Sequence, residues 1–259
     1  MLKIRRYNIR FDFKETVFLL LVGLGSFSVP YGLVYWAEGK ISSGLTATTF
    51  AVMPFFAAIL SSAFLKTNDL SPWKVCGIIL GFTGLLVIFA GDLQFGSFDS
   101  TEGMLAVVVS ALSNSAVAVA VKKHGREIDP VFINLIPMVL GAITLLFTSM
   151  FIESWKGIRF DAPTILSVLY LAIFGSVVAF TLYFYILKHV SVVLLSMSSF
   201  ITPVLALTAG AIVLGEKLPP GTLLGTVLIL GGILVLNLLG ERKNSGKGVA
   251  SDGKEAPVK

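Results

Sequence analysis

Long apolar runs separated by short polar joints dominate this chain. Eight runs carry almost no charged side chains, at residues 16–36, 41–65, 73–90, 103–121, 131–152, 163–187, 191–214 and 221–240. A helix rises about 1.5 Å per residue, so about 20 residues cross a hydrocarbon core about 30 Å thick. Backbone groups in lipid must bond within their own segment, which favours helices for such runs. The pattern predicts an all-α membrane protein, a multi-pass bundle of eight transmembrane helices.

Composition supports lipid as the solvent of these runs. The chain has 259 residues, of which 55% are hydrophobic and 14% charged, and a soluble core of ordinary proportions cannot bury so many apolar side chains. The net charge of +5 does not indicate a nucleic-acid partner, because the basic residues lie at the ends of runs and form no patch. The single cysteine, Cys76, excludes an internal disulfide. The bilayer is the first partner that the composition predicts.

The distribution of lysine and arginine predicts the orientation. Counted over alternate joints and termini, 16 basic residues fall on the side of both termini and 4 on the other side. Cytoplasmic segments carry the excess of basic residues, so both termini are expected in the cytoplasm of a cell membrane, with a prokaryotic plasma membrane favoured. Residues 1–15 are then a basic cytoplasmic segment, and the polar residues 241–259 a disordered cytoplasmic tail.

An internal repeat organises the runs. A shift of 149 residues superposes identical residues in the first and sixth runs and in the second and seventh, for example Val29 on Val178, Leu33 on Leu182 and Pro54 on Pro203. Because five crossings separate matching runs, the two copies enter the membrane from opposite faces. An inverted repeat of five helices follows, a common design of secondary transporters. Residues 92–240 form one complete unit, and residues 16–91 supply only the last three helices of another.

Several of these features together resemble the EamA domain of the drug/metabolite transporter superfamily. They are the mid-helix proline, Leu214-Gly215-Glu216-Lys217-Leu218, the glycine-containing last run and the Asp129-Pro130 joint. The resemblance covers Thr16 to Gly240. It implies two five-helix repeats around a central cavity, and export or import of amino acids, other metabolites or drugs. This chain lacks the first two helices of that pattern, and Lys66-Thr67-Asn68-Asp69-Leu70 replaces the Gly-Glu motif in its first unit.

Residues that carry enzyme chemistry are scarce. Carboxylates and histidines lie at the ends of runs or in joints, and no metalloprotease, nucleophile-elbow, Cys-x-x-Cys or nucleotide-loop pattern occurs. The sequence therefore predicts no catalytic residues, no metal site and no cofactor. A carrier of small molecules that works by alternating access is favoured over an enzyme.

Neutral polar side chains and prolines within the runs are the candidates for a substrate cavity. A proline frees the carbonyl four residues earlier, which lipid cannot satisfy, so the second and seventh runs should kink toward a cavity. Packing kinks, interfacial aromatic anchors and interhelical hydrogen bonds are the alternative readings. The candidate cavity residues are Tyr31, Thr49, Pro54, Asn114, Thr181, Tyr183, Ser199, Thr202 and Pro203.

Glycines in the third and eighth runs are expected to serve helix packing. They are Gly77, Gly81, Gly84, Gly221, Gly225 and Gly232. Spacings of three or four residues let two backbones come close, within the chain or across the interface of a homodimer.

A second functional reading stays open beside the carrier. The chain could be a truncated or non-transporting membrane subunit that needs further helices from an upstream segment or a partner chain. On that reading, the face left uncovered should surround Pro54 and Tyr31, since the absent helices would otherwise cover it.

Overall fold

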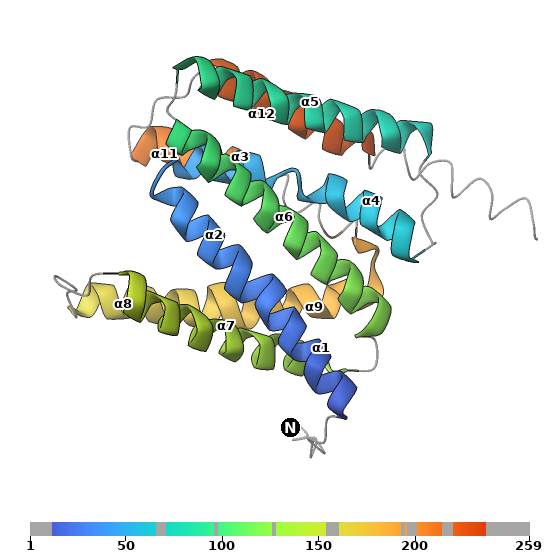
Figure 1. Ribbon diagram of the computed structural model, residues 1–259, viewed down its shortest axis with the longest axis vertical. Coiled ribbons are helices and arrows are strands. Elements are labelled where there is room, and N and C mark those ends of the chain that lie inside the picture. Colours follow the sequence, from blue (N-terminus) through green and yellow to red (C-terminus); the bar gives the residue numbers. More distant parts are fainter. Residues whose placement is uncertain are drawn as a thin grey trace, which may run out of the picture.

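The computed structural model describes residues 12–65, 71–95, 98–125, 128–153, 161–192, 195, 201–213 and 220–236. Every regular element in these ranges is a helix (Figure 1). Six helices are long and apolar enough to cross a membrane. The prediction of an all-α membrane protein is therefore confirmed. Residues 1–11 and 241–259, predicted as a cytoplasmic segment and tail, lie outside the described residues.

Eight full spans are not shown. The runs predicted at 191–214 and 221–240 coincide with two shorter apolar helices, α11 (Ile201–Val213) and α12 (Pro220–Leu234). Parts of both runs lie outside the described residues. The division into three and five inverted helices therefore stays a prediction.

Two spans share one internal plan. The first span, Phe13–Glu38, consists of α1 (Phe13–Gly23), η1 (Leu24–Ser28) and α2 (Val29–Glu38). The sixth span, Ala162–His189, consists of α8 (Ala162–Tyr170), η2 (Leu171–Val178) and α9 (Ala179–His189). The middle segments η1 and η2 are π-helical, with hydrogen bonds to the fifth residue back, a register that often marks functional sites.

The matching features of these two spans lie 149 residues apart. Asp12 and Asp161, separated by that number, are the N-caps, and each side-chain carboxylate accepts a backbone N–H of its helix. Shifted by the same number, Leu24–Ser28 falls on residues 173–177, inside η2. The repeat read from sequence identities therefore extends to caps and helix register.

The second span breaks at its proline. It consists of α3 (Ser43–Phe50) and α4 (Met53–Leu65), joined by a turn at residues 51–52. The ring of Pro54 would clash with the carbonyl of Phe50 in a continuous helix, and it has no N–H to donate. The Met53 carbonyl at the break accepts a hydrogen bond from the Ser115 hydroxyl at 3.0 Å. The predicted kink at Pro54 is therefore a full break that faces the protein interior.

Glycines bring α5 (Pro72–Phe95) and α12 into backbone contact along one side of the bundle (Figure 1). A Cβ atom built on Gly77 would lie 2.7 Å from the carbonyl oxygen of Gly232, and one on Gly84 would lie 2.6 Å from that of Gly225. Gly81 instead faces the ring of Phe55 in α4. Gly221 lies in the first turn of α12 and is half-buried.

The centre of the bundle is α6 (Phe98–His124), which contacts α2, α3 and α4. At one end, Lys40 pairs with two carboxylates of α6, Glu102 at 2.7 Å and Asp99 at 3.4 Å. At the other end, the Lys122 ammonium donates to three carbonyls at the end of α9, those of Leu187, Lys188 and Val190, at 2.7–3.0 Å. Both ends of α6 are therefore tied to neighbouring helices by charged groups.

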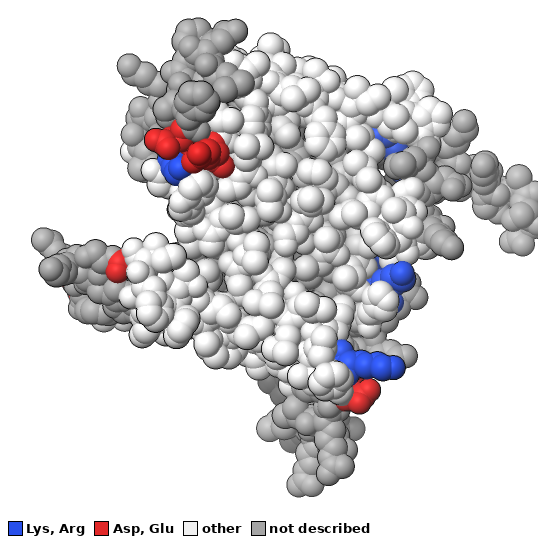
Figure 2. Space-filling model, viewed as in Figure 1, with Lys and Arg blue, Asp and Glu red and all other residues white. Residues whose placement is uncertain are grey.

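Exposed apolar side chains are densest on α7 (Pro130–Ile152) and the sixth span, along the side opposite α5 and α12 (Figure 1). None of the residues in α8 and η2 is buried. Pro54 is buried and Tyr31 is half-buried, so the expectation that the uncovered face surrounds these two residues is wrong. In Figure 2 the coloured charged atoms lie toward opposite margins, with an uncharged band between them.

Candidate functional site

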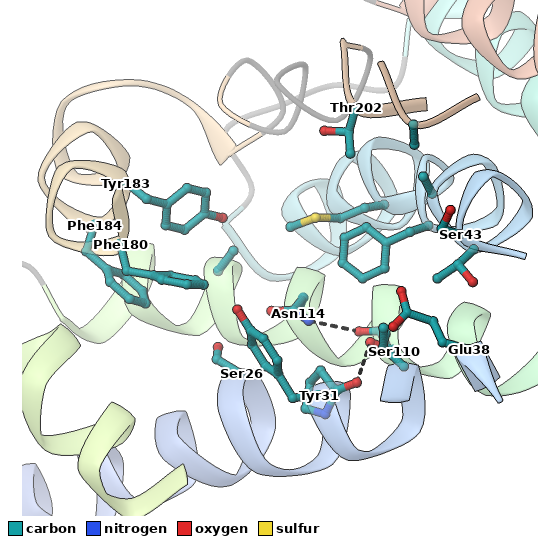
Figure 3. Close-up of a pocket in the computed structure, with 18 residues that line it drawn as sticks. Ser26, Tyr31, Glu38, Ser43, Ser110, Asn114, Phe180, Tyr183, Phe184 and Thr202 are labelled. Carbon is teal, nitrogen blue, oxygen red and sulfur yellow. Dashed lines mark hydrogen bonds between the residues drawn. The ribbon is translucent and has the colours of Figure 1, made fainter. Parts of the chain in front are cut away.

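A cavity of about 510 Å³ lies between helices from distant parts of the chain (Figure 3). The first span, α3 and the start of α4 line one part, and α6, α9 and α11 line the rest. Its size falls within the range of about 300–1,000 Å³ that small-molecule sites occupy. The lining residues are Ser26, Pro30, Tyr31, Val34, Glu38, Ser43, Thr46, Ala47, Phe50, Met53, Ser110, Asn114, Ala118, Phe180, Tyr183, Phe184, Thr202 and Ala206.

Serines of α6 hold the cavity wall by bonding carbonyls of the first span. The Ser110 hydroxyl donates to the carbonyl of Pro30 at 3.2 Å, and the Ser113 hydroxyl donates to that of Gly25, within η1, at 2.7 Å. A hydroxyl that donates across helices satisfies a backbone carbonyl that lipid could not satisfy. The polar side chains of α6 thus fix the position of the irregular first span.

Asn114 presents its amide oxygen to the cavity. Its Nδ2 donates to the carbonyl of Ser110 at 3.2 Å. A carbonyl only accepts hydrogen bonds, so the amide nitrogen must be on that side and the oxygen on the other. Figure 3 shows the side chain between α2 and the opposite wall. Of the two readings left open for Asn114, the side chain lines the cavity, and its hydrogen bond is intrahelical where the other reading expected an interhelical one.

Aromatic rings gather at the α9 end of the cavity. Phe180, Tyr183 and Phe184 come from one helix, and Tyr31 faces them from α2 (Figure 3). The ring centroids of Tyr31 and Phe180 are 6.5 Å apart, and those of Tyr183 and Phe184 are 5.4 Å apart. Such rings form an apolar seat for the body of a ligand.

Among the described residues that line the cavity, Glu38 is the charged one. It is the last residue of α2, is exposed and lies beside Ser43 at the end remote from Phe180 and Tyr183 (Figure 3). Lys40 follows closely in sequence, but its ammonium is bound to Asp99 and Glu102 and lies 4.0 Å from the ring centroid of Trp36. The hydrogen bond to Glu102 raises the pKa of Lys40.

The structure brings only some of the predicted cavity residues together. Tyr31, Asn114, Tyr183 and Thr202 line the cavity. Thr49 and Pro54 are buried beside the break between α3 and α4, and Pro203 is the third residue of α11, but none of these three is among the lining residues. Ser199 lies outside the described residues.

Thr181 has a packing contact in place of the expected cavity contact. Its hydroxyl accepts a hydrogen bond from the side-chain nitrogen of Asn134, in α7, at 3.0 Å. Asn134 is 2% exposed, so this bond ties α7 to α9 in the interior.

The sequence reasoning missed several lining residues, above all Glu38, Phe50, Ser110 and Phe180. Glu38 lies at the end of a run, where a solvent-facing role is the usual one for a carboxylate. The repeat itself held a signal for Phe180, because a shift of 149 residues places Tyr31 on Phe180. Applying the shift to every candidate residue would have found it.

Several similar proteins from bacteria are named as transporters. The uncharacterized transporter YvbV of Bacillus subtilis is 28% identical over 225 residues, 86% of this chain and 73% of the relative. YoaV of the same organism is 29% identical over 217 residues, 83% of this chain and 72% of the relative. The inner membrane transporter YedA of Escherichia coli K12 is 28% identical over 223 residues, 84% and 70% of the two chains.

A solved crystal structure has the same fold. Its TM-score is 0.65 at 21% sequence identity, over 90% of this chain and 79% of the other, and this likeness shows the fold alone. The EamA-like transporter family matches residues 1–90 and 101–238, which is most of the sequence. With an all-helical membrane fold and transporter relatives over most of its length, this chain belongs to the EamA-like transporter family.

Proposed function

We propose that this membrane transporter carries small amphipathic metabolites, such as amino acids or drugs, by alternating access between two inverted halves. Family membership supports transport in general. The substrate class and the mechanism rest on the cavity, which is enclosed by helices of both predicted units. Carriers of inverted-repeat design bind their substrates at such a junction, near the middle of the membrane.

The observation that carries the proposal is the pairing of lining residues across the repeat. Three pairs of residues that are 149 apart both line the cavity, namely Tyr31 with Phe180, Val34 with Tyr183, and Met53 with Thr202. Equivalent residues meet only near the axis that relates two copies. The contact between the rings of Tyr31 and Phe180, with centroids 6.5 Å apart, supports a cavity on that axis.

Charged contacts near the two ends of α6 suit a cavity that opens to one side at a time. Lys40 links the joint between the first and second spans to Asp99 and Glu102 at the start of α6. Lys122 links the end of α6 to the end of α9. In an alternating-access cycle, the contacts at one end loosen while those at the other end hold.

Flux through purified protein in liposomes tests this function. A panel of radiolabelled amino acids and amphipathic amines is offered to proteoliposomes that contain the full chain. Asn114→Leu should lower uptake of any transported compound about tenfold or more, because it removes a polar contact and fills the cavity. Leu112→Ala is the matched control, since Leu112 is an exposed α6 residue outside the lining. Equal loss in both variants would mean that folding, and not recognition, was measured.

We also propose that both termini face the cytoplasm of a prokaryotic cell membrane, on the strength of the 16 to 4 distribution of basic residues. Lys123→Cys and Glu153→Cys place single thiols on exposed residues at opposite ends of the bundle, in a Cys76→Ala background. An impermeant maleimide should label Glu153→Cys in intact cells and Lys123→Cys only after permeabilisation. The reverse pattern would invert the topology.

A second candidate function is a membrane subunit that acts only with further helices from an upstream segment or a partner chain. The exposure of the sixth span favours this candidate, since no residue of α8 or η2 is buried. A homodimer is one form of this candidate. Light scattering of the purified chain gives its oligomeric state, and flux by the monomer alone would exclude the candidate.

A further inference from the structure

The cavity offers hydrogen-bond acceptors and aromatic faces, and the 18 described residues that line it include no lysine, arginine or histidine. We propose that it selects amphipathic organic cations over carboxylates, with Glu38 binding an ammonium head and the rings on α9 holding the apolar body. This inference rests on the proposed function and narrows its substrate class, since it favours amines over amino acids, which carry a carboxylate.

Glu38 supplies the charge. In the described part of the chain it forms no ion pair, while the nearby Lys40 is held by Asp99 and Glu102. The hydrogen bond from Lys40 to Glu102 raises the pKa of Lys40, so the ammonium that pairs with these carboxylates stays charged. The carboxylate at the cavity end therefore faces an incoming ligand without a protein cation to neutralise it.

Three polar side chains of the cavity wall already use their donors within the protein. Ser110 donates its hydroxyl to the carbonyl of Pro30, Thr46 donates to that of Ser42 at 3.1 Å, and Asn114 donates its nitrogen to that of Ser110. What these side chains leave toward the cavity is acceptor capacity, above all the oxygen of Asn114. An ammonium group brings three donors and matches this wall. A carboxylate would find hydroxyl donors such as those of Tyr31 and Tyr183 but no cation among the described lining residues, so the loss of its water would be costly.

The aromatic end fits the other half of such a molecule. Phe180, Tyr183 and Phe184 present rings from α9, at the end of the cavity opposite Glu38 (Figure 3). Aromatic faces attract cations and bury apolar groups, and they give carboxylates no comparable attraction. Because Glu38 and the rings of α9 lie at opposite ends of the cavity, the site favours a ligand with a charged head and an aromatic or aliphatic body.

Three probes of one shape and different charge test the selection. Phenylbutylammonium, phenylbutanol and phenylbutanoate are titrated by calorimetry into the full chain in lipid nanodiscs, with empty nanodiscs measured to subtract partition into lipid. The cation should bind about tenfold or more tightly than the anion, as expected when one charge-assisted hydrogen bond replaces an unfavourable contact. Equal binding of the two ions, or no binding of the cation, would overturn the inference.

Substitutions test which end of the cavity binds the ammonium head and which binds the apolar body. Glu38→Gln should weaken the cation about fivefold or more and leave phenylbutanol unchanged. Glu153→Gln is the matched control, because it removes one exposed carboxylate outside the lining. Tyr183→Leu should weaken both the cation and phenylbutanol, and Tyr185→Leu, an exposed neighbour outside the lining, should weaken neither. An unchanged preference for the cation in Glu38→Gln would remove Glu38 from the proposal.

The same protein in liposomes separates this inference from the proposed function. Flux of anionic or neutral compounds without binding of the cation would leave the transporter intact and refute the cation preference. Selective binding of phenylbutylammonium without flux of any compound would support the cation preference and refute the proposed transport function.

Discussion

The first span and the sixth span begin with equivalent aspartate caps and widen into π-helices at matching positions, yet their surroundings differ. The first span packs against α6 and α7, and a third of its most apolar window is buried. None of the corresponding window of the sixth span is buried.

The comparison shows that neighbours, and not the span's own sequence, determine its burial. Lipid is as apolar as leucine, so an apolar face is not driven inward by hydrophobicity alone. Helices associate where small residues and hydrogen bonds fit a neighbour. The first span has such contacts with α6 and α7, for example Ser113 to Gly25 at 2.7 Å and Ser28 to Thr144 at 2.6 Å. In η2 the described contact of this kind is longer, from the side-chain nitrogen of Asn134 to the carbonyl of Val177 at 3.4 Å.

The largest expected effect comes from overfilling the contact between the first span and α7. A Cβ atom on Gly23 would lie 2.8 Å from the Leu140 side chain and 3.0 Å from the Pro137 carbonyl. Gly23→Leu should lower the free energy of unfolding by about 3 kcal/mol, near the upper end for overpacking. The equivalent residue of the sixth span, Ala172, is exposed, so Ala172→Leu should have little effect. Unfolding in mixed micelles measures the stability of both variants. Equal losses would contradict the difference in packing between the first and sixth spans.

The next effect concerns the charged contact that holds the end of the sixth span. Lys122→Met removes three hydrogen bonds to carbonyls of that span and should lower stability by about 2 kcal/mol. Hydrogen exchange of the amides near Leu187 should rise with it. Lys123→Met is the control, because Lys123 is exposed. If the two variants exchange alike, Lys122 does not anchor the span.

A smaller effect is expected from the hydroxyl pair between η1 and α7. Ser28→Ala removes the bond to Thr144 and should cost about 0.6 kcal/mol, the average for such bonds between membrane helices. Val177, the equivalent residue in η2, is 48% exposed, and Val177→Ala should change stability less. A greater loss from Val177→Ala would show that the sixth span has a partner at this position.

The smallest effect should be the pH dependence of the cap on α8. Hydrogen bonds from Thr164 lower the pKa of Asp161, so the folded state favours the carboxylate. This stabilisation is present at neutral pH and is lost as the pH falls through the lowered pKa. The stability difference between the natural chain and Asp161→Asn should therefore shrink in acid. A difference that persists there would mean that the charge of Asp161 is not the cause.

The helices could be predicted because lipid requires long, uncharged, internally bonded segments. The break near Pro54 also followed from proline chemistry alone. The π-helical segments could not be predicted, since neither 24–28 nor 171–178 contains a residue that requires the wider turn. Their register depends on contacts with other helices, such as the bond from Ser113 to Gly25.

Cavity residues could be predicted from the sequence only where a polar or aromatic side chain within an apolar run also faces the cavity. Tyr31, Asn114, Tyr183 and Thr202 were found because each is a polar or aromatic side chain within a run. Thr181 looked equally suitable, but Asn134 binds its hydroxyl, and such a pairing depends on how α7 meets α9. Polarity in a membrane segment therefore identifies interior residues more readily than it separates ligand contacts from packing contacts.

The glycine contact between α5 and α12 restricts how the molecule can move. The two helices belong to different predicted units, and the contacts of Gly77 and Gly84 leave no room for even a methyl group between their backbones. Lengthwise sliding of α5 against α12 would drive side chains into these contacts. In the proposed cycle the two predicted units would therefore stay joined along this contact, and the cavity would open by rotation of the remaining helices about it.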